Sequence, residues 1–476
     1  MSLLRFLLIL PVTLALAFPM PAQTVDPKLA AMLQHTLDSM RTVLQVKGLS
    51  AAVQLPNDAV WAGARGISSL VPTDSLRTEH AFAVGSTAKM LTAACVLQLA
   101  DEAVLSLDDS LHQWLPSFQY INPNITIRQL LQHRSGLYDV VANPVFQPTL
   151  LQNKNKVWTL QEAISTFINP PVFSPGTSWG YSNTNYILLG MIIEATTGKP
   201  YHEEIRSRFL NPFQLDGFAM PPFEPLPAQV AHLWTDLNGD GVQDDAHNFF
   251  STWNSFFSAA APAGSYFARP SDMARWVRRF GSGSLCLPGT WAQATTTVNT
   301  GMPGGTKYGL GLMERNYLGI KGYGHGGDIS YSSSVFYFPE KDISIAVHSN
   351  DGKINSWSLA TTVAALLRVY LDCESMLTNS DQATVTLPEE MLVAPNPFDE
   401  FITVTVPYTG NLGILKSTLT NAAGQPVASW TLNDTADGSF RLSVPEAGSL
   451  PPGVYFLSVT VNGTSAGVKK LIRTKP

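Results

Sequence analysis

The stretch Gly85-Ser86-Thr87-Ala88-Lys89 opens a tract of helical apolar spacing that runs to about Glu102. A three-residue step on a helix places the Ser86 hydroxyl and the Lys89 amine on one face, within reach of each other. The pair therefore predicts a nucleophile beside a base. A lysine at its reference pKa of about 10.4 is neutral in only about 1 of 2,500 molecules at pH 7, so burial or a helix dipole must lower that pKa. The alternative interpretation is an N-cap serine followed by a solvated lysine.

Two further motifs accompany this pair along the chain. Tyr181-Ser182-Asn183 lies between a Pro/Gly-rich loop and an apolar helical tract, and His325-Gly326-Gly327 opens a late region of strands. In this order and at these separations, the three motifs resemble those of the penicillin-recognising serine hydrolases: class C β-lactamases, soluble D-alanyl-D-alanine carboxypeptidases, and related esterases and D-amino-acid peptidases. Segments 105–109, 125–137 and 308–311 resemble the same family. The resemblance covers roughly residues 28–372.

The resemblance implies a role for each motif residue. Ser86 is the implied nucleophile, Lys89 its base and Tyr181 the shuttle that passes a proton to the leaving group. Substrate binding falls to Asn183, which would hydrogen-bond the substrate amide, and to Gly326, Gly327 and Asp328. His325 stands where β-lactamases commonly carry a lysine, and would assist proton transfer or bind a carboxylate. The backbone N–H groups of Ser86 and Asp328 would form the oxyanion hole.

Each of the later motifs also has a purely structural interpretation. His325 can be a structural histidine in a Gly-rich turn. Tyr181-Ser182-Asn183 can be a helix-entry loop whose asparagine caps the following helix.

The sequence around the motifs, together with the resemblance, predicts an α+β fold. We expect an antiparallel sheet flanked by helices plus an all-helical region, as in β-lactamases and transpeptidases, followed by a small C-terminal β-sandwich. Apolar spacing from Leu29 to Leu44 predicts an opening helix that ends near Gly48. Residues 50–66 predict two strands around a turn, and residues 331–338 and 343–347 two more before a helix over 356–370. Both ends of the domain should therefore complete one sheet.

Composition excludes several classes of protein. Of 476 residues, 45% are hydrophobic and 14% charged, which excludes disorder, and a net charge of −6 leaves no basic surface for nucleic acid. The three cysteines, at 95, 286 and 373, contain no close pair typical of a zinc site, so we expect neither a metal nor a cofactor in catalysis. Cys286 and Cys373 could pair after export, and Cys95 should be a buried thiol.

The two ends of the chain predict export. Arg5, an apolar run from Phe6 to Phe18 and small residues before Gln23 have the layout of a signal peptide over residues 1–22, too short for a membrane anchor. No later segment is apolar enough to span a membrane. We expect the hydrolase domain over 23–375, a polar linker over 376–391 and a C-terminal domain over 392–476.

The C-terminal domain carries its own resemblance. Segments 393–398 and 450–456 and the basic finish Lys469-Lys470-Leu471-Ile472 resemble the sorting domains of the type IX secretion system in Bacteroidetes. The resemblance implies that this secretion machinery is a partner and that the protein is secreted or displayed on the cell surface. A carbohydrate-binding or spacer domain is the alternative.

Two other segments match known functional motifs, one of a serine nucleophile and one of a calcium site. Gly176-Thr177-Ser178-Trp179-Gly180 matches the nucleophile elbow of α/β-hydrolases, but three prolines within residues 169–175 disfavour the buried strand that such an elbow must follow. Residues 236–247 match five positions of an EF-hand loop, with His247 where the bidentate glutamate belongs. This segment is either a weak structural calcium site or an Asp/Asn/Gly-rich surface turn.

The sequence thus predicts an exported serine hydrolase that forms an acyl-enzyme on a small peptide of D-amino-acid type or on an ester. A β-lactamase is the alternative within the family, although Tyr-Ser-Asn with His-x-Gly is closer to the carboxypeptidase and D-peptidase branch. A catalytically silent penicillin-binding-like sensor or scaffold is the alternative from another class. Since export removes the enzyme from its own cell wall, an external substrate or a foreign wall fragment is expected.

Overall fold

The computed structural model describes residues 24–247, 254–381, 392–394, 401–405, 414–421, 426–433, 439–443, 450–461 and 464–473. The expected signal peptide lies outside these ranges, as do residues 382–391 of the expected linker. The chain divides into two compact units, one up to Leu371 and one from Asp372 onward.

The first unit is built on a nine-stranded sheet in which every paired neighbour is antiparallel. Across the sheet the strands are β3 (Thr73–Ser75), β2 (Val60–Leu70), β1 (Gly48–Gln54), β13 (Ile343–Ser349), β12 (Tyr331–Phe338), β11 (Ile320–Ile329), β10 (Met313–Tyr317), β9 (Lys307–Tyr308) and β8 (Val298–Asn299). Strand β1 pairs with β13, so the early hairpin and the late strands share one sheet, as the sequence predicts. All residues of β1, β12 and β13 are buried, because helices cover both faces of these central strands.

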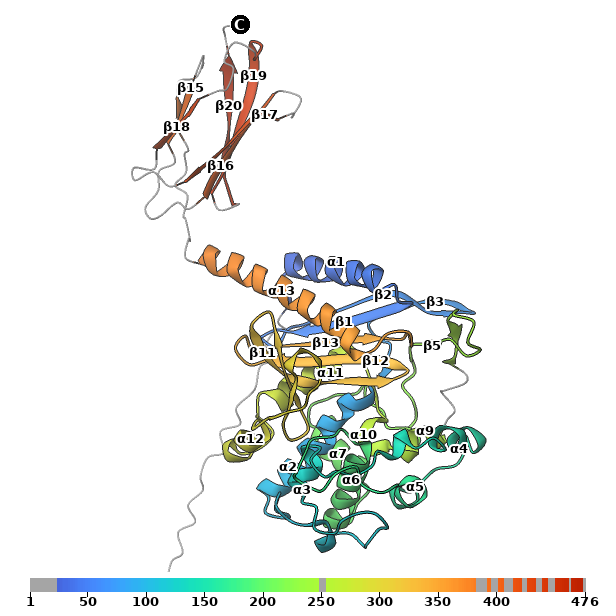
Figure 1. The fold of residues 1–476 in the computed structure, drawn as a ribbon. Coiled ribbons are helices and arrows are strands. Elements are labelled where there is room, and N and C mark those ends of the chain that lie inside the picture. Colours follow the sequence, from blue (N-terminus) through green and yellow to red (C-terminus); the bar gives the residue numbers. More distant parts are fainter. Residues whose placement is uncertain are drawn as a thin grey trace, which may run out of the picture. The chain divides into compact units, whose positions relative to one another are not determined.

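Helix α1 (Pro27–Leu44) and the first part of α13 (Ser356–Asp381) lie over one face of the sheet (Figure 1). Helix α1 begins with the Asp26 carboxylate, which accepts hydrogen bonds from the N–H groups of Lys28 and Leu29, and it buries Leu29 and two later leucines. It ends at Gln45 in a left-handed conformation (φ 54°), so the expected end near Gly48 is wrong. Gly48 instead starts β1, where a Cβ would lie 2.5 Å from Asn350 Oδ1.

The opposite face is covered by α11 (Pro270–Gly281), which packs on β1, β12 and β13, and beyond it by the helical region (Figure 1). The helices of that region are η1 (Gly85–Ala88), α2 (Lys89–Asp101), η2 (Leu111–Gln113), α3 (Ile127–Leu131), η3 (Val140–Ala142), α4 (Phe146–Gln152), α5 (Leu160–Phe167), α6 (Asn183–Thr197), α7 (Tyr201–Ile205), η4 (Arg206–Leu210), α9 (Asn254–Ala259), α10 (Ala261–Gly264), α12 (Pro288–Ala294) and η5 (Pro303–Gly305). Two short ladders join β4 (Phe82–Ala83) to β7 (Phe267–Ala268) and β5 (Trp234–Thr235) to β6 (Asp244–Asp245).

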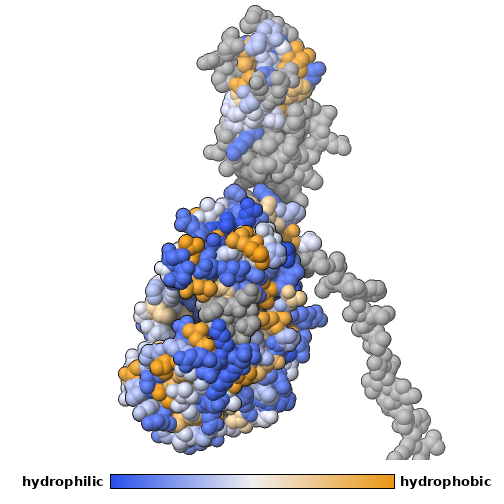
Figure 2. Space-filling view, turned by 90° about the vertical axis from the view of Figure 1, so that its right-hand side faces the viewer, coloured by the Kyte–Doolittle hydropathy of each residue, from blue (hydrophilic) through white to orange (hydrophobic). Residues whose placement is uncertain are grey.

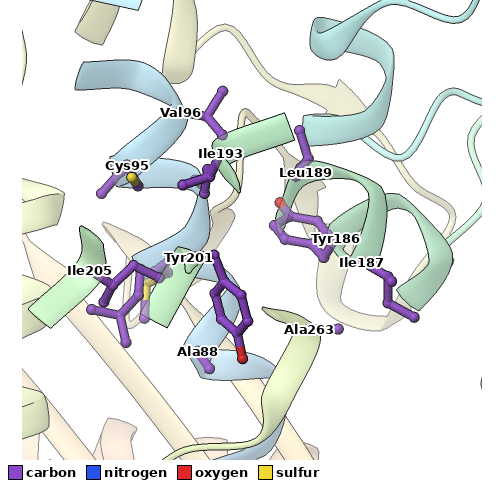
Figure 3. Packing of buried hydrophobic residues seen from close by; sticks show 14 of the residues in the cluster. Ala88, Cys95, Val96, Tyr186, Ile187, Leu189, Ile193, Tyr201, Ile205 and Ala263 are labelled. Atoms are coloured by element: carbon purple, nitrogen blue, oxygen red, sulfur yellow. The ribbon is translucent and has the colours of Figure 1, made fainter. Parts of the chain in front are cut away.

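Helices α2 and α6 form the centre of the core. Both are apolar almost all round and are buried over most of their length, as the sequence predicts for α2. Figure 3 shows Cys95 and Val96 of α2 beside Ile193 of α6, with Tyr201 and Ile205 of α7 in the same cluster. Helix α2, which begins at Lys89 directly after the short helix that carries Ser86, is therefore held rigidly by packing. The surface of the first unit is mostly hydrophilic on the face shown in Figure 2, with small hydrophobic patches.

The second unit contains two small antiparallel sheets. One has the order β14 (Leu392–Ala394), β15 (Phe401–Thr405), β18 (Ser439–Ser443), and the other β17 (Pro426–Asn433), β16 (Ile414–Asn421), β19 (Gly453–Val461), β20 (Thr464–Arg473). Leu419, Leu457 and Leu471 are buried in the four-stranded sheet. In the sequence, Ile402, Val404 and Val406 alternate with polar residues, as Tyr455, Leu457, Val459 and Val461 alternate with their neighbours, and this period-two pattern predicts strands. The structure has strands there, in β15 and β19.

Helix α13 is longer than expected. It continues past Tyr370 to Asp381 and so includes the first residues of the expected linker. Polar residues extend an established helix because each added residue gains a backbone hydrogen bond without a new nucleation step.

Other expectations concern cysteines and membrane spans. Cys95 is fully buried, and among the described residues no disulfide joins Cys286 to Cys373. No helix in the described ranges has the length and apolar character needed to cross a membrane.

Candidate active site

Ser86 and Lys89 lie where the chain enters α2. The short helix η1 carries Ser86, which is partly exposed, and α2 begins with Lys89, whose side chain is completely buried. Lys89 Nζ is 3.0 Å from Ser86 Oγ, 2.7 Å from Asn183 Oδ1 and 2.6 Å from the carbonyl oxygen of Ala263. The structure thus brings the predicted nucleophile, base and asparagine together, and the solvated-lysine alternative is wrong.

The hydrogen bonds of Lys89 determine where its lone pair points when the amine is neutral. The Asn183 and Ala263 oxygens are carbonyl oxygens that can only accept, so the two hydrogens of a neutral amine are directed to them. The lone pair is then directed to Ser86 Oγ, which can donate its proton. This is the arrangement that a general base requires.

Burial supplies the pKa shift that the sequence argument demands. It lowers the pKa of Lys89 to about 7, and the negative charge of Asp139 partly opposes the effect. The neutral amine is therefore far more populated at pH 7 than in an ordinary lysine.

Asp139 is the residue at this site that sequence reasoning misses. Its carboxylate accepts hydrogen bonds from Asn183 Nδ2 at 2.9 Å, from the Asn183 backbone N–H at 3.2 Å and from the Val141 N–H at 3.1 Å. Asn183 is therefore fixed between Asp139 and Lys89, with one Nδ2 hydrogen left for a substrate. Burial raises the pKa of Asp139, while the N–H donors and Lys89 oppose that rise. The only sign of Asp139 in the sequence is its position just beyond segment 125–137. In the structure it caps η3.

Asn183 itself is the first residue of α6, and its side chain is directed to Lys89 and Asp139. The alternative interpretation, in which this asparagine caps the helix, is wrong.

Tyr181 lies directly over the amine. Its ring centre is 4.9 Å from Lys89 Nζ and 4.3 Å from the ring of His133. Burial raises the pKa of Tyr181 well above its usual range, and the nearby Ser86 hydroxyl moderates the shift without meeting hydrogen-bond geometry. The phenol therefore keeps its proton at neutral pH.

His133, in segment 125–137, supports this tyrosine. It is completely buried, and its Nδ1 accepts from the Ser182 backbone N–H at 3.2 Å and from Asn185 Nδ2 at 2.9 Å. Burial, with Lys89 and His325 nearby, lowers the pKa of His133 well below its usual range. The neutral imidazole thus fixes the backbone between Tyr181 and Asn183.

His325 is also buried and neutral. Its Nδ1 lies 2.5 Å from the Gly326 carbonyl oxygen, which can only accept, so Nδ1 carries the proton. Its Nε2 then accepts from the Tyr308 hydroxyl at 2.9 Å. Burial and the nearby Lys89 lower the pKa of His325 to about 3. The Tyr308 partnership is a second feature absent from the sequence analysis, because it joins β9 to β11 across β10.

The backbone around Ser86 approaches β11 closely. A Cβ on Gly327 would lie 2.1 Å from the Val84 carbonyl oxygen and 3.0 Å from the Ser86 nitrogen, and one on Gly85 (φ 55°) would lie 2.8 Å from the Asp328 nitrogen. Only glycine fits at both positions. These contacts place the Ser86 and Asp328 backbone nitrogens near each other, as a two-donor oxyanion hole requires.

Asp328 contributes its backbone to this region and directs its side chain elsewhere. The carboxylate accepts from the Ser356 backbone N–H and hydroxyl, both at 2.7 Å, and from the Ser332 hydroxyl at 3.1 Å. It therefore caps α13 and fixes the strand that carries its own N–H.

A cavity of about 240 Å³ lies against Ser86. It is lined by Gly85, Ser86, Val141, Phe146, Gln147, Asn183, Phe256, Ala260, Ala263, Gly264, Ser265, Asp328, Ile329 and Ser330. A larger hollow of about 550 Å³ lies at the far end of α2 beside Arg128 and includes no predicted site residue. The smaller cavity is the candidate substrate site because it contains the nucleophile.

The competing serine motif has no such setting. Ser178 is exposed in the loop between α5 and α6, and no strand precedes it within the described residues 168–182. The match to a nucleophile elbow is therefore due to chance, as the prolines predict.

The EF-hand-like segment forms a tight turn. The Asp236 carboxylate accepts hydrogen bonds from the N–H groups of Gly239, Asp240 and Gly241. Within the described ranges, no group of three or more His, Cys, Asp or Glu side chains is placed to hold a metal ion. The turn accounts for the Asp/Asn/Gly pattern by itself.

Comparison with known proteins agrees with this geometry. The family model described as Beta-lactamase matches residues 33–370, which include every residue of the candidate site. The chain belongs to the beta-lactamase family. A D-stereospecific amidohydrolase from Streptomyces sp. is 30% identical, with a TM-score of 0.59, over 69% of this chain and 95% of that one.

Two curated members of the beta-lactamase family are also similar. Esterase EstB of Burkholderia gladioli is 24% identical over 329 residues, 62% of this chain and 81% of that protein. A penicillin-binding protein of Bacillus subtilis (strain 168) is 29% identical over 187 residues, and the match spans 39% of that protein's length.

A second family model, described as Secretion system C-terminal sorting domain, matches residues 392–474. The tail is therefore a type IX sorting domain, and it indicates export to the cell surface or the medium.

Proposed function

We propose that the chain is an exported serine hydrolase that acts through an acyl-enzyme on a peptide of D-amino-acid type or on an ester. One observation carries the proposal: the two carbonyl oxygens on Lys89 direct its lone pair to Ser86. The amidohydrolase and esterase relatives support the two substrate types.

The reaction begins when Ser86 Oγ attacks the substrate carbonyl carbon and its proton passes to Lys89. The carbonyl oxygen becomes an oxyanion, which the Ser86 and Asp328 N–H groups stabilise. Gly85 and Gly327 allow these two N–H groups to lie close together. Collapse of the tetrahedral intermediate breaks the bond to the leaving group. Tyr181 gives its proton to that group and regains one from Lys89. Water then hydrolyses the acyl-enzyme by the reverse sequence of proton transfers.

His325 acts indirectly in this scheme. Binding a carboxylate through charge would need an imidazolium, and the buried, doubly hydrogen-bonded ring favours the neutral form. Its contacts instead hold Tyr308 and Gly326, and the motif lies inside strand β11 and not in the Gly-rich turn of the structural alternative.

The test is labelling with a fluorophosphonate, followed by mass spectrometry of the modified peptide. We expect the adduct on Ser86, its loss in Ser86→Ala, and unchanged labelling in the matched loop variant Ser178→Ala. A silent sensor would give no adduct. Hydrolysis of D-amino-acid peptides, short esters and nitrocefin by the same protein then separates the peptidase, esterase and β-lactamase alternatives.

A further inference from the structure

The third-motif position is closed to an anionic substrate group. His325 is fully buried, and both ring nitrogens are already bonded, Nε2 to Tyr308 and Nδ1 to Gly326. Protonation of the ring would place a positive charge away from solvent, and the Tyr308 hydroxyl would have to turn its own proton elsewhere to accept from Nε2. At this position the chain therefore has a neutral imidazole whose two nitrogens are both hydrogen-bonded, where a charged lysine could have bound a carboxylate.

The Lys89 amine beside the nucleophile is likewise fully hydrogen-bonded by protein groups. The contacts of Lys89 are Ser86, Asn183 and Ala263, and its side chain has no exposed surface. Its charge, when present, is opposed by Asp139 on the other side of Asn183. Lys89 thus presents little net positive charge to the cavity.

The cavity wall is apolar or neutral. Phe146, Phe256 and Ile329 supply apolar surface, and the single charged side chain in the described lining belongs to Asp328. That charge is negative, and Ser332 and Ser356 hold it.

We infer that this site selects acyl substrates that carry no carboxylate next to the scissile bond, namely esters and capped amides with an apolar group for the cavity. The inference rests on the proposed function, because it names the substrate class of the same nucleophile. A carboxylate would lose its hydration in a cavity without a cation to replace the water, whereas an uncharged group loses much less.

The test compares substrates that differ only in this charge. One pair is N-acetyl-D-Phe-D-Ala with a free carboxylate and the same dipeptide with a terminal amide, followed by release of D-Ala or D-alaninamide. The other is penicillin G and its methyl ester, followed by the rate of Ser86 acylation in mass spectra. We expect kcat/KM or the acylation rate to favour the uncharged member at least about tenfold.

A designed cation provides the converse test. Gln147 is exposed on α4 and lines the cavity. Gln147→Lys should reduce the preference for uncharged members at least about threefold, with the effect weakened by salt. The matched neutral variant Gln147→Met should leave the ratio as it is.

The outcomes separate the inference from the function on which it rests. Equal rates within a pair, or a preference for the free acid, overturn the inference. So does a protein that reacts with the fluorophosphonate at Ser86 but with neither uncharged member. Absence of fluorophosphonate labelling is instead a failure of the proposed function.

Discussion

Asp139→Asn removes one charge from the site while nearly preserving the size of the side chain. Hydrogen bonds of 2.9 and 2.7 Å on either side of the Asn183 amide put the carboxylate and the Lys89 amine roughly 7 Å apart, where a unit charge at an effective dielectric constant of about 20 is worth roughly 2 kcal/mol. The negative charge stabilises the ammonium form and so raises the pKa of Lys89. Its removal must lower that pKa.

The consequence is a shift of the pH profile. Because catalysis needs the neutral amine, the acid limb of kcat/KM should move down by about one pH unit, with a discount for solvent screening. At pH 9 Lys89 is mostly neutral in both the wild-type protein and Asp139→Asn. The ratio of their kcat/KM values at this pH therefore reports only the orientation of Asn183. We expect a loss of about tenfold there, because the new amide cannot accept from all three N–H donors.

The assay is hydrolysis of p-nitrophenyl butyrate from pH 5 to pH 9, corrected for the spontaneous reaction. Asp108→Asn is the matched control, since this aspartate pairs with Arg128 at the far end of α2. An acid limb that stays in place or moves upward in Asp139→Asn would refute the electrostatic link between Asp139 and Lys89. A limiting rate unchanged at pH 9 would refute the positioning role.

Three further predictions concern the same site and the tail. Lys89→Arg should be nearly as inactive as Lys89→Ala in the ester assay, because arginine stays protonated; near-normal activity would exclude the base role. Gly327→Ala should lower kcat/KM at least about 100-fold, because its Cβ would meet Val84 at 2.1 Å and separate the two oxyanion donors, and full activity would contradict that geometry. Truncation after Asp381 should leave ester turnover unchanged but retain the enzyme in the cell envelope of its host; appearance of the truncated protein in the medium would count against the sorting role.

Local patterns account for the features that the sequence predicted. The Ser86–Lys89 pair follows from helical spacing, and the hairpin over 50–66 and the late strands follow from apolar runs and turn residues. The closing of the sheet by both chain ends follows from their strand character. Family resemblance added Tyr181, Asn183 and His325 as members of one site.

The missed features depend on tertiary contacts between distant segments. Asp139 meets Asn183 across 44 residues, and Tyr308 meets His325 across an intervening strand. No local pattern encodes such contacts. The end of α1 was misplaced because Gln45 adopts the left-handed conformation that glycine usually supplies, while Gly48 was needed for its close approach to Asn350.

The pairing of β1 with β13 also sets when this enzyme can first act. Leu49 lies opposite Ser349, so the central strands meet only after some 300 intervening residues have been synthesised. Contacts of such long range form slowly, because a large loop must close before they stabilise anything. In the proposed oxyanion hole, the Asp328 N–H joins the Ser86 N–H only when β11 has taken its place in the sheet. In a partly made chain Ser86 therefore lacks this partner, so on the proposed mechanism the serine cannot be acylated efficiently until the sheet is complete.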